Sequence, residues 1–439
     1  MPLKFHRSYP PTAFGALLSV LMIAHGATAC RCNASQTPTR APTQPQPRPG
    51  EEPEFETPDD AGSDARAALP PCTLGARTPL ASNVGDAATD RFETPSIEWG
   101  SRGAFVAFVD RASARLQVAR SSDVLSSVAL GRETVSALRA IELSPERSLV
   151  FSVSAVDRAR WQRAFVTEGG ALRPLAARRG AADDALNLAA CAVRGGALIA
   201  WDEAVSEGRS AVRVQRWTGA ERAEPTTITV SAPEHDASDP VLAALPDGGA
   251  VVAYLALQEV EVEIANQSAA DIVVRALGPD GAPRGEPIVL TPRPKTRFGV
   301  TLHMTSTGRW AAWRLASDSD HEGLGDGGRV AVVALGDDLR PVRTPEYLTE
   351  LDVVPAGRIA IVSEGGADGR ADVYWTERRG EDLVTVRRSV GRDGALLGPA
   401  RDEPALAGQL PIGGPASEPT VASWGPAGEP GVARARCPR

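Results

Sequence analysis

Apolar and polar positions recur along most of the chain in one short pattern. It consists of a small or turn-forming residue, any residue, two mostly apolar residues, a small residue and an aromatic residue. The copies begin at Gly103, Arg147, Gly196, Gly249, Gly308, Arg370 and Pro419. The copy at Arg147 ends in Ser152 and has its aromatic, Phe151, one place early. A unit that recurs about every 50 residues predicts a repeat architecture, in which each unit buries its apolar face against its neighbours.

Shorter apolar segments on both sides of each copy indicate further strands. A weaker strand precedes the pattern, as in 188–193, and a strand with alternating apolar and polar residues follows it, as in 211–216. Turn signals such as Gly278-Pro-Asp-Gly281 then lead into a short last strand. Four antiparallel strands in each of seven units predict an all-β, seven-bladed β-propeller, with six or eight blades as alternatives. We expect the recurring aromatic on the second strand to pack between blades rather than to bind a cofactor.

The two ends of the repeat region predict how the ring closes. The last copy has a second strand at 420–424 and a third at 431–436, and lacks a fourth. Residues 74–83 look like a fourth strand without a blade of their own. We therefore expect the amino-terminal strand to complete the last blade. This would place Cys72 beside Cys437 and predicts a disulfide, which an exported chain permits.

The first 29 residues have the pattern of a secretory signal peptide. Basic residues come first, residues 13–24 are almost wholly apolar, and Ala27-Thr28-Ala29 follows. Cys30 comes directly after these small residues, as in the bacterial lipobox, which this segment resembles. In that family the Cys becomes the first mature residue and carries the lipid, although the family usually has Leu where this chain has Ala27. Ordinary cleavage after Ala29, leaving Cys30 as a free amino-terminal thiol, is the alternative.

A proline-rich segment separates Cys30 from the repeats. Residues 30–71 contain nine prolines and only one aromatic, Phe55. Such a segment cannot bury enough apolar surface to offset the entropy of ordering, so it predicts a disordered tether. The chain is thus expected to consist of a lipoprotein-type signal peptide at 1–29, a tether at 30–71 and a single propeller at 72–439.

Lipobox, tether and loose repeats together are similar to the predicted β-propeller lipoproteins of the Gram-negative bacterial envelope. The resemblance covers the whole chain and implies an exported protein. It implies an outer-membrane anchor through a lipid on Cys30, with the propeller facing the periplasm or the cell surface. It implies no reaction, because members of that group mostly lack assigned activities. A periplasmic or secreted protein without the lipid is the alternative.

Charge and cysteine usage narrow the partners. The formal net charge is −8, and removal of Lys4 and Arg7 with the signal peptide takes it to −10. So acidic a chain without a basic patch is a poor partner for nucleic acid. Cys191 lies in an apolar inner strand and is predicted to be a buried free thiol, while Cys32 in the tether has no assignment. No metalloprotease, P-loop or nucleophile-elbow motif is present, and no cofactor is expected.

Two acidic loops are the candidate binding residues. Both connect the second and third strands of neighbouring units, so both should emerge on one face of the ring. This candidate acidic face comprises Glu259, Glu261, Glu263, Asp318, Asp320, Glu322 and Asp326. Asp318, Asp320 and Glu322 also resemble the start of a Ca²⁺ loop, but its twelfth position is Arg329, where a bidentate Glu is needed. Calcium is therefore a weak candidate ligand.

These observations favour a non-enzymatic envelope lipoprotein, whose propeller is a platform for a protein or glycan partner. The alternative is an exported hydrolase or lyase that acts on glycans at the propeller face. It would use paired carboxylates among Asp236, Asp239, Asp318 and Asp320, close to His235. Acidic residues are frequent in such connections, which favours the platform. A secreted structural propeller without a lipid is the third interpretation.

Overall fold

The computed structural model describes most of the repeat region, and all of its described residues belong to one compact unit, Arg66–Arg439. The described ranges are 70–80, 96–110, 113–120, 123–130, 133–156, 159–180, 187–206, 209–221, 223–258, 269–291, 297–315, 329–349, 355–363, 369–424 and 430–438. The predicted signal peptide, Cys30 and Cys32 lie outside them, as does the predicted tether apart from Pro70 and Pro71. Among the described residues, no helix is long and apolar enough to cross a membrane.

Strands pair into seven units, which we call blades 1 to 7. Blade 1 is β3 (Ser96–Gly100), β4 (Gly103–Asp110), β5 (Arg115–Arg120) and β6 (Asp123–Ala129). Blade 2 is β7 (Thr134–Ser144), β8 (Arg147–Val156), β9 (Ala159–Glu168) and β10 (Ala171–Gly180). Blade 3 is β11 (Ala189–Val193), β12 (Gly196–Ser206), β13 (Arg209–Trp217) and β14 (Thr227–Thr229). Blade 4 is β15 (Asp236–Ala244), β16 (Ala250–Gln258), β17 (Ala269–Leu277) and β18 (Pro283–Val289).

The other three blades follow the same order. Blade 5 is β19 (Arg297–Met304), β20 (Arg309–Leu315), β21 (Val330–Ala334) and β22 (Glu346–Tyr347). Blade 6 is β23 (Pro355–Ser363), β24 (Ala371–Arg379), β25 (Asp382–Val390) and β26 (Leu396–Asp402), followed by the 3-10 turn η2 (Pro404–Leu406). Blade 7 is β27 (Pro411–Gly413), β28 (Thr420–Trp424) and β29 (Pro430–Arg436), completed by β1 (Thr73–Leu74) and β2 (Thr78–Pro79).

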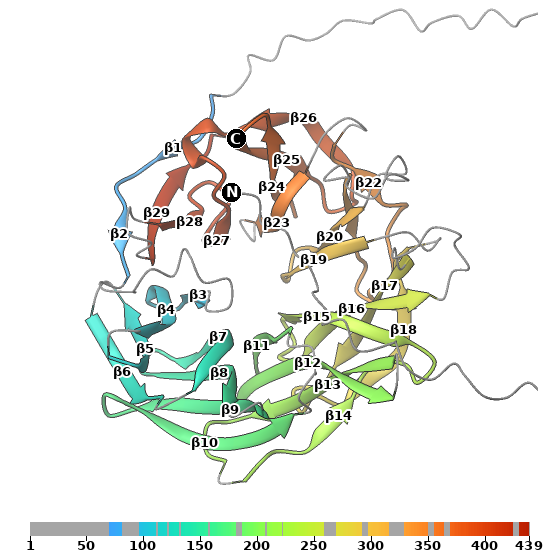
Figure 1. The fold of residues 1–439 in the computed structure, drawn as a ribbon. Coiled ribbons are helices and arrows are strands. Elements are labelled where there is room, and N and C mark those ends of the chain that lie inside the picture. The colour runs from blue at the N-terminus through green and yellow to red at the C-terminus, as the bar shows by residue number, and fades with distance from the viewer. Residues whose placement is uncertain are drawn as a thin grey trace, which may run out of the picture. The chain divides into compact units, whose positions relative to one another are not determined.

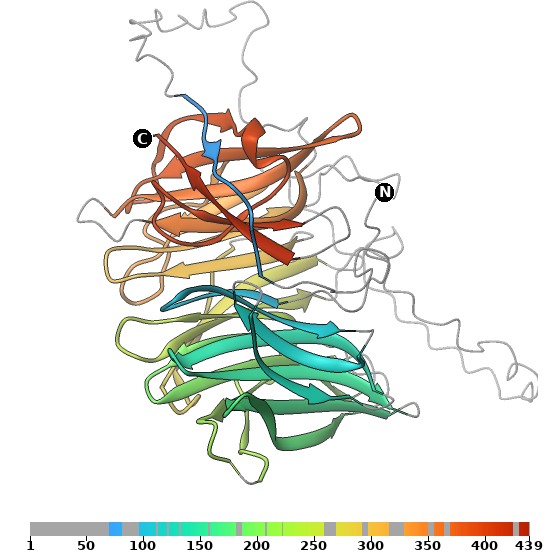
Figure 2. The same cartoon turned by 90° about the vertical axis from the view of Figure 1, so that its left-hand side faces the viewer.

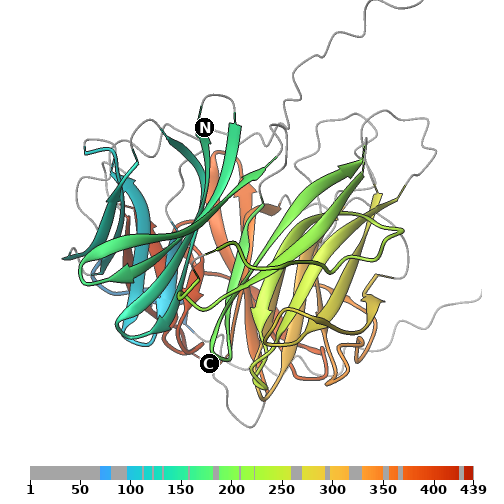
Figure 3. The ribbon, with the colours of Figure 1, turned by 90° about the horizontal axis from the view of Figure 1, so that it is seen from below.

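The blades form a seven-bladed β-propeller, which confirms the predicted fold class. The first strand of each blade lies nearest the centre of the ring and the last strand lies at its outer edge (Figure 1). Every copy of the sequence pattern falls on the second strand of its blade, from β4 to β28. Seen from below, the strands of each blade run side by side and twist (Figure 3), as expected for antiparallel sheets of L-residues.

The apolar core is divided among the interfaces between blades. Seven buried clusters occur, and each contains side chains from two neighbouring blades. One of them joins Leu80 and Val432 of blade 7 to Phe108 of blade 1, so the series of interfaces closes on itself. Because both faces of a blade are covered, strands such as β21 are buried along their whole length. A blade therefore has no core of its own, and its stability depends on its neighbours.

The aromatic that ends the pattern packs against the preceding blade, as expected from the sequence. Trp201, Tyr254, Trp313 and Trp375 are at most 5% exposed and lie in the cluster shared with the blade before them. Blade 2 departs from this arrangement in the way its sequence does. Phe151 is one position early, so the pleat turns it towards blade 3, where its ring packs edge-on against Trp217 at 5.9 Å between centroids.

The amino-terminal strands close the ring. Both β1 and β2 pair antiparallel with β29, with Thr73 opposite Arg436 and Thr78 opposite Val432. Figure 2 shows this segment in blue, running along β29 in red. The predicted disulfide between Cys72 and Cys437 is present and joins residues 365 positions apart. Cys191 is the free buried cysteine of the described residues, as predicted, and burial raises the pKa of its thiol to about 12.

One connection between blades was not anticipated. The outer strands β6 and β10 share a parallel bridge between Ser127 and Ala171, so blades 1 and 2 form one eight-stranded sheet. The bridge covers part of two sheet edges that would otherwise be open to strand pairing. The repeat predicts the seven units, but this edge-to-edge contact depends on where two outer strands meet in space.

Candidate functional site

The candidate acidic face cannot be placed, because Glu259, Glu261, Glu263, Asp318, Asp320, Glu322 and Asp326 all lie outside the described residues. Their positions in the chain match the prediction. The first group falls between β16 and β17, and the second between β20 and β21, which are equivalent connections of neighbouring blades. The calcium hypothesis rests on three of these residues and stays a prediction. Within the part of the chain that is described, no cluster of three or more His, Cys, Asp or Glu residues could hold a metal.

Arg329 is the described end of the calcium-like segment. Its guanidinium lies 4.3 Å from the ring centroid of Tyr347 on β22, a cation–π contact within blade 5. The residue at the position where a calcium loop needs a bidentate Glu therefore makes a packing contact at the outer strand.

His235 and Asp236, which the sequence places at the entry to blade 4, have local partners. Nδ1 of His235 lies 3.1 Å from the hydroxyl of Tyr254, which also accepts a hydrogen bond from the backbone N–H of Ala232. The carboxylate of Asp236 accepts a hydrogen bond from the backbone N–H of Ser210 at 2.7 Å. Both side chains thus hold the connection into β15 against blade 3 and the second strand of blade 4.

Asp239, the remaining candidate in this connection, meets a carboxylate that the sequence analysis did not single out. Its backbone N–H donates to Oδ2 of Asp202 at 3.3 Å. The amide nitrogen of Asn187 donates to the carboxylates of both Asp239 and Asp202, in the latter case at 3.4 Å. We call Asn187, Asp202 and Asp239 the carboxylate pair site. It joins blade 3 to blade 4 at the start of their inner strands.

Local backbone geometry explains how these side chains come together. Asp202 follows the aromatic of the repeat on β12, so the pleat turns it away from Trp201 and towards blade 4. The register of β15 against β16 shifts between Ser238 and Val241, which marks a β-bulge. Asp239 sits in this bulge with φ +51°, a left-handed conformation that Asp tolerates better than most residues. The bulge directs the backbone N–H of Asp239 at the neighbouring blade.

Asp202 is buried, and no cation among the described residues pairs with it. Asp202 is 1% exposed, and its Oδ1 has no hydrogen-bond partner among the described residues. Burial raises the pKa of Asp202 above its ordinary value, and the charge of Asp239 raises it further. The hydrogen bonds from Asp239 and Asn187 oppose this shift only in part. The pair can therefore hold a proton at a pH where an exposed carboxyl would have lost it.

The exposure of the three residues differs in a way that assigns them different chemical tasks. Asn187 is exposed and Asp239 is half-buried, so both can meet a ligand. Asp202 is enclosed behind them and can act only through Asp239. The arrangement resembles an acid–base pair in which one carboxyl controls the other.

Sequence reasoning missed Asp202 because it follows a residue that belongs to the packing pattern. A signal was nevertheless present, since Val109, Val153 and Leu255 occupy the same position in blades 1, 2 and 4. The signal is weak, because blades 5, 6 and 7 have Arg314, Thr376 and Gly425 at this position. The partners of Asp202 could not be found in this way, because Asn187 and Asp239 lie on other strands.

No protein-family model matches this chain, and no curated protein matches it either. Solved structures do match. The α-L-arabinanase of Penicillium chrysogenum complexed with arabinobiose is 10% identical, with 84% of this chain and 99% of that chain covered and a TM-score of 0.40. A thermostable family-43 glycoside hydrolase is 11% identical, with 62% and 95% covered and a TM-score of 0.36. The subtype N10 neuraminidase-like protein of A/little yellow-shouldered bat/Guatemala/060/2010 is 9% identical, with 71% and 96% covered and a TM-score of 0.40.

Proposed function

We propose that this chain is an exported glycan-active propeller, and that the carboxylate pair site takes part in hydrolysis of a glycosidic bond. The observation that carries the proposal is the contact of a half-buried Asp239 with a fully buried Asp202 whose pKa is raised. Glycoside hydrolysis needs one carboxyl that gives a proton and one that attacks or activates water.

In this proposal Asp239 is the catalytic residue and Asp202 is a positioning residue. Asp239 touches the glycan as base or nucleophile, and Asn187 orients it through the shared hydrogen bond. Asp202 sets the charge of the pair but remains enclosed. The sequence offers Asp318 and Asp320 as candidates for the second reacting carboxyl.

The test is release of reducing ends from a panel of neutral and acidic polysaccharides by the mature chain. Asp239→Asn should lower kcat by about 10²-fold or more, the usual contribution of a catalytic acid or base. Asp236→Asn is the matched control, because it is an equally conservative change on the same strand whose hydrogen bond to Ser210 an amide can keep. Asp202→Asn should shift the pH–rate profile rather than abolish activity. Equal rates for the Asp239 variant and the wild type would contradict the proposal.

A second candidate function is a binding platform for an envelope protein or glycan. It is favoured by the enclosure of Asp202, which leaves only Asn187 and Asp239 accessible for contact at this site. Calorimetric titration with the same polysaccharides separates the two functions. Binding without product formation, weakened by Asp239→Asn, would support the platform. A crosslinking pull-down from the envelope would then identify a protein partner.

We also propose that the chain is a lipoprotein of the outer membrane, tethered through Cys30, with a periplasmic or secreted form as the alternative. The support is the sequence alone, namely small residues before Cys30 and the proline-rich segment after it. Mass spectrometry of the amino-terminal peptide tests this directly. An acylated Cys30, lost in Cys30→Ala together with membrane association, is the expected result. An unmodified Cys30 would contradict it.

A further inference from the structure

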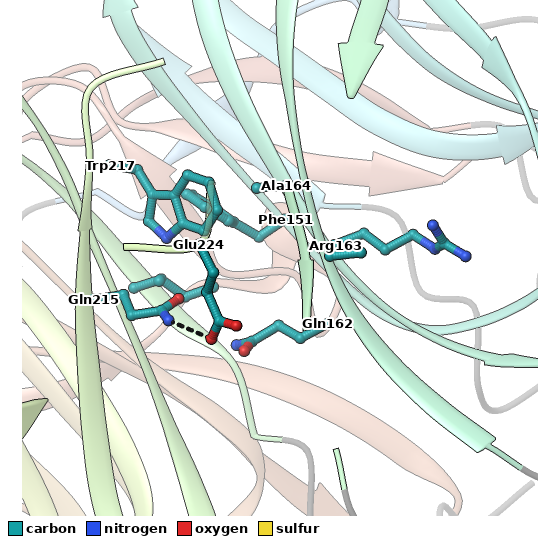
Figure 4. Close-up of a pocket in the computed structure, with 9 residues that line it drawn as sticks. Phe151, Gln162, Arg163, Ala164, Gln215, Trp217 and Glu224 are labelled. Carbon is teal, nitrogen blue, oxygen red and sulfur yellow. Dashed lines mark hydrogen bonds between the residues drawn. The ribbon is translucent and has the colours of Figure 1, made fainter. Parts of the chain in front are cut away.

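A small cavity lies between blades 2 and 3, away from the carboxylate pair site. Its apolar wall is formed by Phe151, Ala164 and Ile199, and its polar side by residues of β9 and β13 and by Glu224. In Figure 4 the carboxylate of Glu224 lies between the side-chain amides of Gln215 and Gln162, and the indole of Trp217 lies on the same side of the cavity as Gln215. Arg163 extends away from it.

Two polar atoms at this cavity are buried and lack partners among the described residues. One is the indole Nε1 of Trp217, a residue that is 4% exposed. The other is Oε1 of Gln162. The first can only donate a hydrogen bond and the second can only accept one. The amide nitrogen of Gln215 does not serve Gln162 Oε1, because it already donates towards Glu224, Pro225 and Thr227 at 2.9 to 3.1 Å.

The size of the cavity decides what can occupy it. Its volume is about 10 Å³, which is close to the minimum for one water molecule and far below the space a sugar needs. A cation is excluded by the chemistry of the lining, since the N–H of Trp217 would point its positive end at the ion. An apolar occupant would leave both buried polar atoms without a partner.

We infer that this cavity is a binding site for one internal water molecule that links blades 2 and 3. The water accepts a hydrogen bond from Nε1 of Trp217 and donates to Oε1 of Gln162 and to the carboxylate of Glu224. Three hydrogen bonds are the usual number for a buried water, and such waters belong to the structure rather than to the solvent. The site joins β9 to β13 at an interface where Phe151 has changed sides relative to the repeat.

The experiment combines a crystal structure at a resolution that shows ordered solvent with NMR cross-relaxation between water and the ¹⁵N-labelled Trp217 indole. We expect one solvent peak within hydrogen-bond distance of Trp217 Nε1 and Gln162 Oε1, and a long-lived water in the NMR experiment. In Gln162→Leu, which removes the acceptor and adds apolar volume, both signals should vanish.

A pair of Trp variants separates the water from simple packing. Trp217→Phe removes the donor to the water. Trp313→Phe is the matched control, because Trp313 is 2% exposed and its Nε1 also lacks a partner among the described residues, yet it does not line this cavity. The Trp217 variant should lower Tm by about 1–3 °C more than the control. A solvent-free cavity in the wild-type crystal, or equal Tm changes in the two variants, would overturn the inference.

Discussion

Two interfaces of the ring bury carboxylates. At one interface the neighbouring group is a cation, and at the other it is a second carboxylate. Between blades 6 and 7, Asp372 and Glu403 are completely buried around Arg387. Nε of Arg387 lies 2.8 Å from Oε1 of Glu403, and Nη1 lies 3.5 Å from Oδ2 of Asp372. Between blades 3 and 4, Asp202 is equally buried, but its neighbour is another carboxylate, Asp239.

The ion network between blades 6 and 7 stabilises the fold, whereas folding alone does not explain the buried carboxylate between blades 3 and 4. Glu403 accepts a hydrogen bond from the backbone N–H of Cys72 at 2.5 Å, so the ion network holds the closing disulfide in place. Burial alone would lower the pKa of Arg387, but Tyr374, Glu403 and Asp372 outweigh it and raise the pKa. Asp202 has no such compensation, and an Asn could make its hydrogen bonds without the charge. We therefore place the functional proposal at blades 3 and 4.

The largest effect should come from opening the ring. Replacing Cys72 and Cys437 by Ser removes a link across 365 positions, and loop entropy predicts a loss of at most about 6 kcal/mol of unfolding free energy. Urea unfolding of the double variant measures it, and reductant should have no further effect on that variant. Cys191→Ala, at a buried free thiol, is the control and should lose at most about 1 kcal/mol. A similar loss of unfolding free energy in the double variant and in Cys191→Ala would show that the disulfide does not stabilise the closure of the ring, where β1 and β2 pair with β29.

Removing Arg387, the buried cation between blades 6 and 7, should have the next largest effect on the free energy of unfolding. Arg387→Met leaves Asp372 and Glu403 buried without an opposite charge, which costs about 3–5 kcal/mol. Arg284→Met is the control, since Arg284 pairs with Asp247 at a site where about half of each side chain is exposed. A surface pair of that kind contributes about 0–1 kcal/mol. If the two variants unfold at the same urea concentration, the buried network is not compensated as described.

The interface between blades 5 and 6 tests whether a buried histidine makes the stability of the protein depend on pH. His303 of blade 5 lies 2.9 Å through Nε2 from the hydroxyl of Ser363 in blade 6, and burial lowers its pKa from 6.5 to about 4. The unfolded chain then binds the proton first, so stability should fall as pH drops from 6.5 to about 4, by up to about 3 kcal/mol.

Unfolding free energies measured across this range check the prediction. His303→Gln has no proton to take up and should show a flatter profile than the wild type between these pH values. Identical profiles would mean that folding does not lower the pKa of His303.

The smallest effect should have the opposite sign. Asp202→Asn keeps the shape of the carboxylate pair site and removes a buried charge, so it should raise stability at pH 7 by about 1 kcal/mol. Because the folded pKa of Asp202 is raised, the gain should disappear when pH falls below the unfolded pKa of 3.8. Asp372→Asn, between blades 6 and 7 beside Arg387, should instead lower the stability of the protein. A stability loss in both variants would make Asp202 a structural residue and remove the basis for the proposed function.

Much of the architecture could be predicted from the chain because its signals are local. Each copy of the pattern lies within one strand, and its aromatic marks one face of that strand. Closure could be predicted because the last repeat lacks a strand and a cysteine stands at each end of the seam. The carboxylate pair site could not, since Asn187 and Asp239 are 52 positions apart and meet only across an interface between blades.

The sequence by itself determined the seven units, the strand that carries each aromatic, and the disulfide that closes the ring. These follow from alternation along a strand and from repetition, which act over a few residues or at fixed spacing. Only the tertiary structure decided that Asp202 faces Asp239, that β6 meets β10, and that Trp217 and Gln162 share one cavity. Burial and hydrogen bonding across an interface depend on where two strands come to lie. No spacing along the chain encodes that position.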